Sequence, residues 1–150
     1  MTRSEMEILI KARAAIVITT FAAMLAINSM VSGSNSSAVL QGTIASGNLW
    51  AWYQAKNVRS AIFEESGNTA EAERMRQDMS DIMEKARAVE AKRDHAKTRS
   101  PYFTYAGSAL QIGIVLSTSA ILAVAMPLLW ASVGVGAIGT GLLAYGYLGV

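Results

Sequence analysis

Charged residues occur in only two stretches of the chain, and this distribution constrains the fold more than any other feature. Every Lys, Arg, Asp and Glu lies in Met1–Arg13 or in Lys56–Arg99. Ala14–Ala55 and Ser100–Val150 carry no charge, and only 16% of all residues are charged, against roughly 25% in soluble domains. A soluble fold lacks the polar surface to cover such stretches. A membrane protein with one polar segment outside the bilayer has this pattern.

Three segments are apolar and long enough to cross a bilayer. The first has 18 uncharged residues, near the roughly 20 that a spanning helix needs, and only a helix satisfies its own backbone in hydrocarbon. We predict an all-α membrane protein with an N-terminal polar tail at residues 1–13 and three transmembrane helices, at 14–31, 101–126 and 128–150. Pro127 separates the last two, which should form a tight hairpin.

A cleaved signal peptide is the alternative interpretation of the first apolar segment, because a basic start precedes it. The apolar run is long for a signal peptide, and the small residues after it form a weak cleavage site. We therefore favour a retained anchor.

Residues 32–100 have the pattern of a long helical hairpin between the first and second spans. The sequence SGSNSS (Ser32–Ser37) should break the chain after the first span, and SGN (Ser66–Asn68) should turn it. Asn68 and Glu71 have the spacing of a capping box for the second helix of the hairpin. Pro101 suits the first turn of the span that follows.

Both helices of this hairpin should pack through apolar residues at helical spacing. The expected packing face of the first helix consists of Leu40, Ile44, Ala51, Ala55, Val58 and Ile62. That of the second helix, at about residues 69–99, consists of Met75, Met79, Ile82, Ala86, Val89 and Ala96. Because a short turn joins the two, we expect an antiparallel, coiled-coil pairing.

The stretch LWAWYQAKNVR (Leu49–Arg59) gathers aromatic residues where the uncharged part of the chain ends. Too few basic residues accompany them for an RNA-stacking platform, and an aromatic belt at the membrane surface is an alternative interpretation. Trp50 and Trp52 should lie off the hairpin seam, which indicates a second buried surface and oligomerisation. The protein-interface candidates are therefore Trp50, Trp52, Tyr53, Gln54, Lys56, Arg59, Met75, Met79 and Ile82.

The last span contains GVGAIG (Gly134–Gly139), which matches the dinucleotide-binding pattern G-x-G-x-x-G. That motif needs a preceding strand and a later acidic residue, whereas here it lies in a hydrophobic span followed by no acidic residue. We expect the glycines to let helices approach closely in the membrane. The helix-packing candidates are Gly134, Gly136, Gly139, Gly141 and Gly146.

No residue pattern indicates catalysis. The chain has one histidine, His95, and no cysteine, and the carboxylates of the hairpin should be solvated rather than buried. We expect no enzyme activity, metal, cofactor or small-molecule substrate. The hairpin segment mixes ten basic with nine acidic residues, so no nucleic-acid surface is expected.

Asn28, Ser29 and Gln111 are polar residues at membrane depth. Hydrogen bonds between helices are their commoner use, but they can also line a path for a solute. The expected function is a non-enzymatic membrane scaffold or accessory subunit, as a homo-oligomer or within a larger membrane complex. An oligomeric pore or channel is the alternative.

Two stretches, ASGNLWAWYQAKNVRSAIFE (Ala45–Glu64) and GSALQIGIVLSTSAILA (Gly107–Ala123), resemble the DUF4337 family of bacterial membrane proteins. That family has a W-x-Y-Q-A-K-type core after its first span, a charged helical stretch, and a third span that opens near a Trp, matched here by Trp130. The resemblance implies a three-span architecture and no catalytic residues. The family often has basic residues between its last two spans, and VAMPLL here has none.

The resemblance also implies the bacterial inner membrane. Lys11 and Arg13 precede the first span, whereas the residues that directly follow it are uncharged. This asymmetry favours a cytoplasmic N-terminus and a periplasmic hairpin. Basic residues at 92–99 crowd the hairpin side of the second span and argue for the opposite orientation. We favour the first orientation because the first helix usually dominates.

Overall fold

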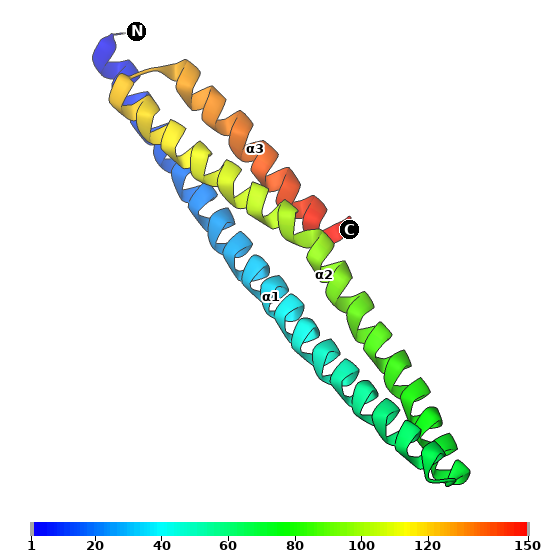
Figure 1. Ribbon diagram of the computed structural model, residues 1–150. Helices are drawn as coiled ribbons and strands as arrows, with labels where there is room; N and C mark the ends of the chain where they lie inside the picture. Colours follow the sequence, from blue (N-terminus) through cyan, green and yellow to red (C-terminus); the bar gives the residue numbers. More distant parts are fainter. Residues whose placement is uncertain (1, 150) are drawn as a thin grey trace. The chain divides into compact units, whose positions relative to one another are not determined.

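The computed structural model describes residues 2–149, which form three α-helices and no strand. They are α1 (Arg3–Glu65), α2 (Thr69–Ala123) and α3 (Met126–Leu148), shown in Figure 1. The predicted all-α fold is confirmed. Met1 and Val150, at the ends of the predicted N-terminal tail and last span, lie outside the described residues.

The chain divides into two compact units. The three-helix unit consists of Met1–Asn35 and Thr98–Val150, and the hairpin unit consists of Ser36–Lys97. Helices α1 and α2 contribute to both units, whereas α3 belongs to the three-helix unit alone.

The predicted break at Ser32–Ser37 is wrong, because α1 continues through these residues. Glycine and serine weaken a helix locally, by about 1 kcal/mol for glycine relative to alanine. Contacts with α2 offset this weakness: Asn35 Nδ2 donates a hydrogen bond to Ser100 Oγ at 2.9 Å. Pro101 likewise begins no separate helix but lies inside α2, within one turn of Thr98, where the two units divide.

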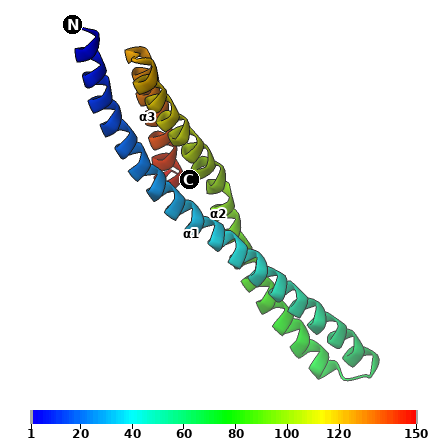
Figure 2. The same cartoon turned by 90° about the vertical axis from the view of Figure 1, so that its left-hand side faces the viewer.

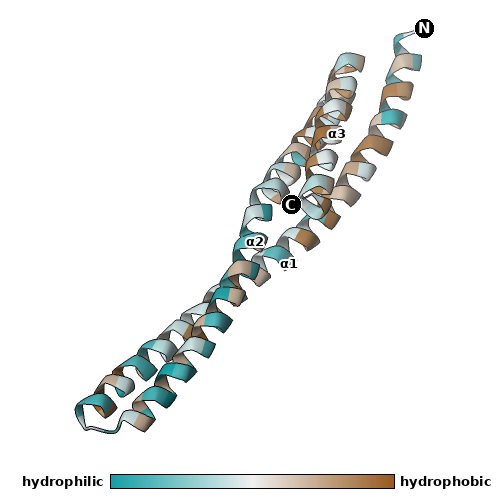
Figure 3. Ribbon diagram, turned by 90° about the vertical axis from the view of Figure 1, so that its right-hand side faces the viewer, coloured by the Kyte–Doolittle hydropathy of each residue, from teal (hydrophilic) through white to brown (hydrophobic). Residues whose placement is uncertain are grey.

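Each of the three helices contains a segment long and apolar enough to cross a membrane, as the sequence predicts. Figure 3 shows the hydrophobic residues of α1 in the three-helix unit and the mostly hydrophilic residues near the turn of the hairpin unit. Two apolar clusters form the core of the three-helix unit. One contains Ala14, Ala120 and Leu129, and the other contains Phe103, Ala106 and Leu143.

The ring of Phe21 lies against two glycines, one on α2 and one on α3. A Cβ atom on Gly113 would lie 2.9 Å from Phe21 Cε2. A Cβ atom on Gly136 would overlap the ring of Phe21 itself. These glycines therefore provide the space that a buried aromatic ring from α1 fills, and any side chain there would force the ring to move.

The turn between α1 and α2 is a Schellman motif centred on Gly67, whose φ of 78° favours glycine. Gly67 N–H donates to Glu64 O at 3.0 Å, and Asn68 N–H donates to Phe63 O at 2.9 Å. Asn68 Oδ1 accepts a hydrogen bond from Glu71 N–H at 3.4 Å. The predicted turn and the Asn68 cap are thus present, while the Glu71 side chain bonds Arg74 instead of completing a capping box.

The join between α2 and α3 consists of Val124 and Ala125. Val124 has a φ of 51°, which is unusual for a β-branched residue, and Ala125 N–H donates to Ala120 O at 3.1 Å. Pro127 then lies in the first turn of α3, where its missing N–H leaves no helical bond unmade. The join is tight, as the sequence predicts.

Candidate functional site

The hairpin unit is held together by a seam in which positions alternate three and four residues apart. On α2 the buried and half-buried seam residues are Ala72, Met75, Met79, Ile82, Ala86, Val89, Arg93 and Ala96. On α1 they are Val39, Gly42, Ser46, Leu49, Tyr53, Lys56, Ser60 and Phe63. This is the spacing of coiled-coil packing, and Figure 2 shows the two helices side by side up to their turn.

The predicted packing face of α2 is confirmed, but that of α1 is wrong. Leu40, Ile44, Val58 and Ile62 are between 56% and 62% exposed, so they face away from α2. Three of the eight seam residues on α1 are small, namely Gly42, Ser46 and Ser60, and small residues let helices approach closely. At Gly42, an added Cβ would lie 2.8 Å from Arg93 Cβ, which leaves no room for a side chain.

Seven exposed residues of α1 in the hairpin unit, all small or apolar, lie along one line, which we call the outer stripe. At 100° per residue, the stripe lies on the opposite side of α1 from the seam. None of its members is charged. The outer stripe consists of Leu40, Ile44, Gly47, Ala51, Ala55, Val58 and Ile62.

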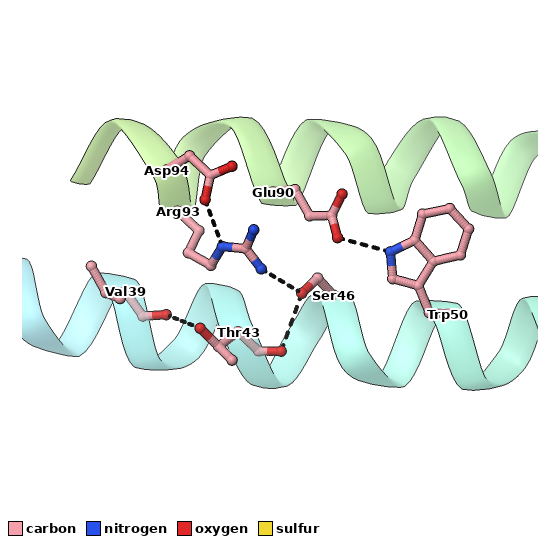
Figure 4. A network of polar contacts seen from close by, with 7 residues as sticks. All are labelled: Val39, Thr43, Ser46, Trp50, Glu90, Arg93 and Asp94. Carbon is pink, nitrogen blue, oxygen red and sulfur yellow. Dashed lines mark hydrogen bonds and ion pairs between the residues drawn. The ribbon is translucent and has the colours of Figure 1, made fainter. Parts of the chain in front are cut away.

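A network of polar contacts joins the two helices of the hairpin unit (Figure 4). Trp50 Nε1 donates a hydrogen bond to Glu90 Oε1 at 2.8 Å. Arg93 Nη1 donates to Ser46 Oγ at 3.4 Å, and the Ser46 hydroxyl donates to Thr43 O at 3.1 Å. The network fixes how α1 and α2 are aligned lengthwise, because each bond requires one register.

Arg93 also binds its sequence neighbour, with Nε donating to Asp94 Oδ1 at 2.9 Å. This hydrogen bond lowers the pKa of the Asp94 carboxyl and raises the pKa of the Arg93 guanidinium. Both groups therefore stay charged at neutral pH, and Arg93 keeps its donors directed at α1.

Ion pairs continue the contact between α1 and α2 toward the turn. Lys56 Nζ lies 2.6 Å from Asp78 Oδ2, and the Lys56 side chain is only 16% exposed. Arg76 pairs with Glu64 nearer to the turn. Lys56 thus occupies a seam position with its charge balanced by the opposite helix.

The structure divides the predicted interface residues between two locations. Trp52, Gln54 and Arg59 are exposed, and Trp52 is 57% exposed. Trp50 lies beside the seam rather than in it, but its indole reaches Glu90 of α2 and packs edge to face on Tyr53 with ring centroids 5.5 Å apart. The residues that contribute to the seam and its network are Trp50, Tyr53, Lys56, Met75, Met79 and Ile82.

The glycines of α3 also divide into two groups. Gly136, Gly139 and Gly146 are buried, and each faces side chains of the other helices of the three-helix unit. Gly134 and Gly141 have no atom within 4 Å of an added Cβ. The first group serves packing within the chain, and the second lies on an open face of α3.

Buried polar side chains of the three-helix unit bond between helices. Asn28 Nδ2 donates to Phe103 O at 3.0 Å, and its buried Oδ1 has no hydrogen-bond partner among residues 2–149. The hydroxyls of Ser117 and Ser132 lie 2.6 Å apart, and Ser132 also donates to Gly113 O at 2.7 Å. Ser117 and Ser132 pair α2 with α3, and Asn28 pairs α1 with α2.

The side chain of Arg99 caps the last turn of α3 with hydrogen bonds. Its Nε donates to Gly146 O and its Nη2 donates to Tyr147 O, both at 2.7 Å. The guanidinium also lies 5.8 Å from the ring centroids of Phe103 and Tyr147. Sequence reasoning missed this role, because it depends on the fold that brings the last turn of α3 beside α2.

Over residues 2–149, no group of three or more His, Cys, Asp or Glu side chains could hold a metal ion. The carboxylates of Asp78 and Glu64 are engaged in ion pairs. Gln111 and Ser29, the other polar residues singled out at membrane depth, are exposed. The outer stripe is the candidate functional site that these residues leave.

The domain of unknown function DUF4337 matches residues 10–74 and 64–149. The chain belongs to the DUF4337 family. No curated protein and no solved structure matches this DUF4337 protein. The match covers both units, so the outer stripe and the seam both lie within the family's domain.

Proposed function

We propose that this DUF4337 protein is a non-enzymatic, multi-pass membrane scaffold that assembles with other polypeptides through its hairpin unit. The observation that carries the proposal is the outer stripe. Four large apolar side chains along one helix face are more than half exposed, and such a face marks an interaction site when it is contiguous.

The three-helix unit has the features of a membrane-embedded domain. Trp130 and Tyr147 lie near opposite ends of α3, about 26 Å apart at 1.5 Å per residue. That separation is close to the roughly 30 Å thickness of the hydrocarbon core. Aromatic residues at both ends, with Arg13 in the groove beside Trp130, fit the interfacial anchors of a membrane protein.

The outer stripe is not suited to lipid tails. Ser46, Trp50 and Lys56 of α1 contact Arg93, Glu90 and Asp78 of α2. Since α1 carries the stripe on one side and contacts charged α2 residues on the other, this part of α1 belongs in water, where exposed apolar side chains favour a protein partner.

Location and orientation follow as part of the proposal. We place the protein in a bacterial inner membrane, with a cytoplasmic N-terminus and a periplasmic hairpin unit, because Lys11 and Arg13 precede the uncharged segment. A single Ser66→Cys variant tests the orientation. An impermeant maleimide should label it from the periplasmic side of intact cells; labelling only after the membrane is opened would reverse the orientation.

Maleimide protection tests the scaffold proposal. The chain has no cysteine, so Ala51→Cys introduces a single thiol in the outer stripe of the full chain. Ala88→Cys is the matched control, because Ala88 is also exposed, on α2. In native membranes we expect Ala51→Cys to label much more slowly than Ala88→Cys. Equal labelling would mean that nothing covers the stripe and would contradict the proposal.

An oligomeric pore is the second candidate, favoured by one observation. Gln111 is exposed on α2 within an apolar segment, beside Ser108 in a groove of about 380 Å³. Several copies with these faces together would surround a polar path. Liposome flux through the wild type that Gln111→Leu reduces would support a pore; silent liposomes at high protein load would oppose it.

A further inference from the structure

The outer stripe repeats its residues in a regular pattern. Leu40, Ile44, Gly47 and Ala51 are spaced by four, three and four residues, and Ala51, Ala55, Val58 and Ile62 repeat the same spacing. The repeat is therefore 11 residues long, or 3.67 residues per turn, which keeps one face aligned along nearly straight helices with a slight right-handed twist. Leu40 and Ile62 lie about 33 Å apart on this face.

The stripe places small residues between two pairs of large ones. Gly47, Ala51 and Ala55 are four residues apart, and an added Cβ at Gly47 would meet no atom within 4 Å. Leu40 and Ile44 precede them, and Val58 and Ile62 follow. A second helix can therefore approach closely at the centre of the stripe, while large side chains meet at both ends.

The charge pattern indicates which helix fits this face. On α1 no charged residue occurs from Ser36 to Ala55, while the outward side of α2 carries many charges of both signs. A partner of a different kind is usually selected by charges at the rim of its site, and Arg59 is the one exposed charged residue of α1 between Leu40 and Ile62. When two identical helices pair in parallel and in register, each residue lies beside the same residue of the other copy. An uncharged stripe can pair in this way without bringing like charges together.

Anchoring in a membrane fixes the direction of the pairing. This step rests on the proposed function: copies inserted with the same orientation have their hairpin units on the same side of the membrane, and each α1 leaves the first span in the same chain direction. Stable soluble complexes bury roughly 800 Å² per partner. Confinement to one membrane raises the effective concentration, so a smaller interface suffices.

We propose that the outer stripe binds the outer stripe of a second copy of this chain, with the two α1 helices parallel and in register. In the pair, Gly47, Ala51 and Ala55 of one copy contact the same residues of the other. The dimer is built from the face of α1 opposite the seam, so the contacts of α1 with α2 remain as they are in the single chain.

Oxidative cross-linking of single-cysteine variants in native membranes tests this proposal. Thiols joined in a disulfide need Cα atoms about 4.4–6.8 Å apart, so only residues that meet their own copy should form one. We expect Ala51→Cys and Val58→Cys to give disulfide-linked dimers and Ala88→Cys to give none. Ala51→Cys mixed with Val58→Cys should give mostly the two homodimers, since an in-register pair separates residues 51 and 58.

A charge introduced into the stripe provides the second measurement. With Val58→Cys as reporter, Ala51→Glu should lower the dimer yield about tenfold, because it buries two like charges. The matched change Ala88→Glu should leave the yield unchanged. Ala51 is exposed in the single chain, so the substituted protein keeps its fold, which circular dichroism checks.

The outcomes separate this inference from the proposed function. If Ala51→Cys is protected from maleimide but yields no disulfide dimer, another protein covers the stripe; the self-pairing is overturned and the scaffold proposal stands. The same holds if the cross-link joins the chain to a different polypeptide. If Ala51→Cys labels as fast as Ala88→Cys, both proposals fail.

Discussion

Trp50 Nε1 donates a hydrogen bond to Glu90 Oε1 at 2.8 Å, and this contact joins α1 to α2 across the hairpin. Glu90→Ala should therefore leave the indole N–H without its acceptor and destabilise the hairpin unit by about 1 kcal/mol. For a chain of this size the melting temperature should fall by about 2–4 °C. Thermal unfolding in detergent, followed by circular dichroism, measures the change.

Glu84→Ala is the control for this prediction, because Glu84 is exposed on the same helix. It should leave the melting temperature unchanged. If Glu84→Ala lowers stability as much as Glu90→Ala, the bond to Trp50 is not the cause.

Gly136→Ala should destabilise the three-helix unit, because the new methyl group would overlap the Phe21 ring. Overpacking of this kind costs about 1–3 kcal/mol. The matched change Gly134→Ala adds the same methyl group where no atom lies within 4 Å, and we expect little effect. Unfolding of the purified protein in mixed micelles compares the two variants.

A compensating substitution makes the Gly136 prediction sharper. Phe21→Leu shortens the side chain that occupies the space beside Gly136, so it should recover part of the stability that Gly136→Ala loses. Additive losses in the double variant would show that the two residues do not meet.

Arg99→Ala should loosen the last turn of α3, because it removes the donors to Gly146 O and Tyr147 O. Amide hydrogen exchange in residues 143–149 should accelerate about tenfold. Arg99→Lys keeps the charge but not the planar fork of donors, so we expect an intermediate rate. Arg87→Ala, a change at an exposed residue of the hairpin unit, serves as control and should leave this exchange unaltered.

The Arg93–Asp94 hydrogen bond should make the hairpin unit weaker in acid. It lowers the pKa of Asp94 in the folded protein, so its stabilising effect is complete above the unfolded-state value of about 3.9. The effect is lost as the pH falls through the lower folded-state pKa. Carboxyl-carbon NMR should show the Asp94 midpoint rising in Arg93→Gln and staying unchanged in Arg87→Gln.

The sequence predicts the helices of this protein well, because their signals are long and redundant. The uncharged stretches on either side of Lys56–Arg99 predict three apolar helical segments, and Met75, Met79 and Ile82 identify the packing face of α2. Gly67 and Asn68 mark the turn because a positive φ and a helix cap have direct residue preferences.

The helix break after the first span was predicted wrongly for a physical reason. Serine and glycine at residues 32–37 reduce helix stability locally, but the local cost is small beside the packing of α1 on α2. The hydrogen bond from Asn35 to Ser100 is one of these contacts. It joins residues far apart in sequence, so local pattern carries no signal for it.

The packing face of α1 was predicted wrongly because this helix carries two faces with helical spacing. Leu40, Ile44 and Ile62 of the predicted face are more apolar than Gly42 and Ser46, which lie in the true seam. Small residues pack well where backbones approach closely, yet a hydrophobicity pattern gives them little weight. The contacts of Trp50 and Lys56 were beyond reach because they depend on the register between α1 and α2.

The close approach of Gly42 to Arg93 has an evolutionary consequence. A Cβ at position 42 would lie 2.8 Å from Arg93 Cβ, an atom next to the backbone that no rotamer change moves aside. The two positions therefore constrain each other: a homologue can acquire a side chain at 42 only when residue 93 is glycine or the helices separate. In an alignment of family members, we expect these distant columns to change together, with glycine kept at 42 wherever arginine is kept at 93.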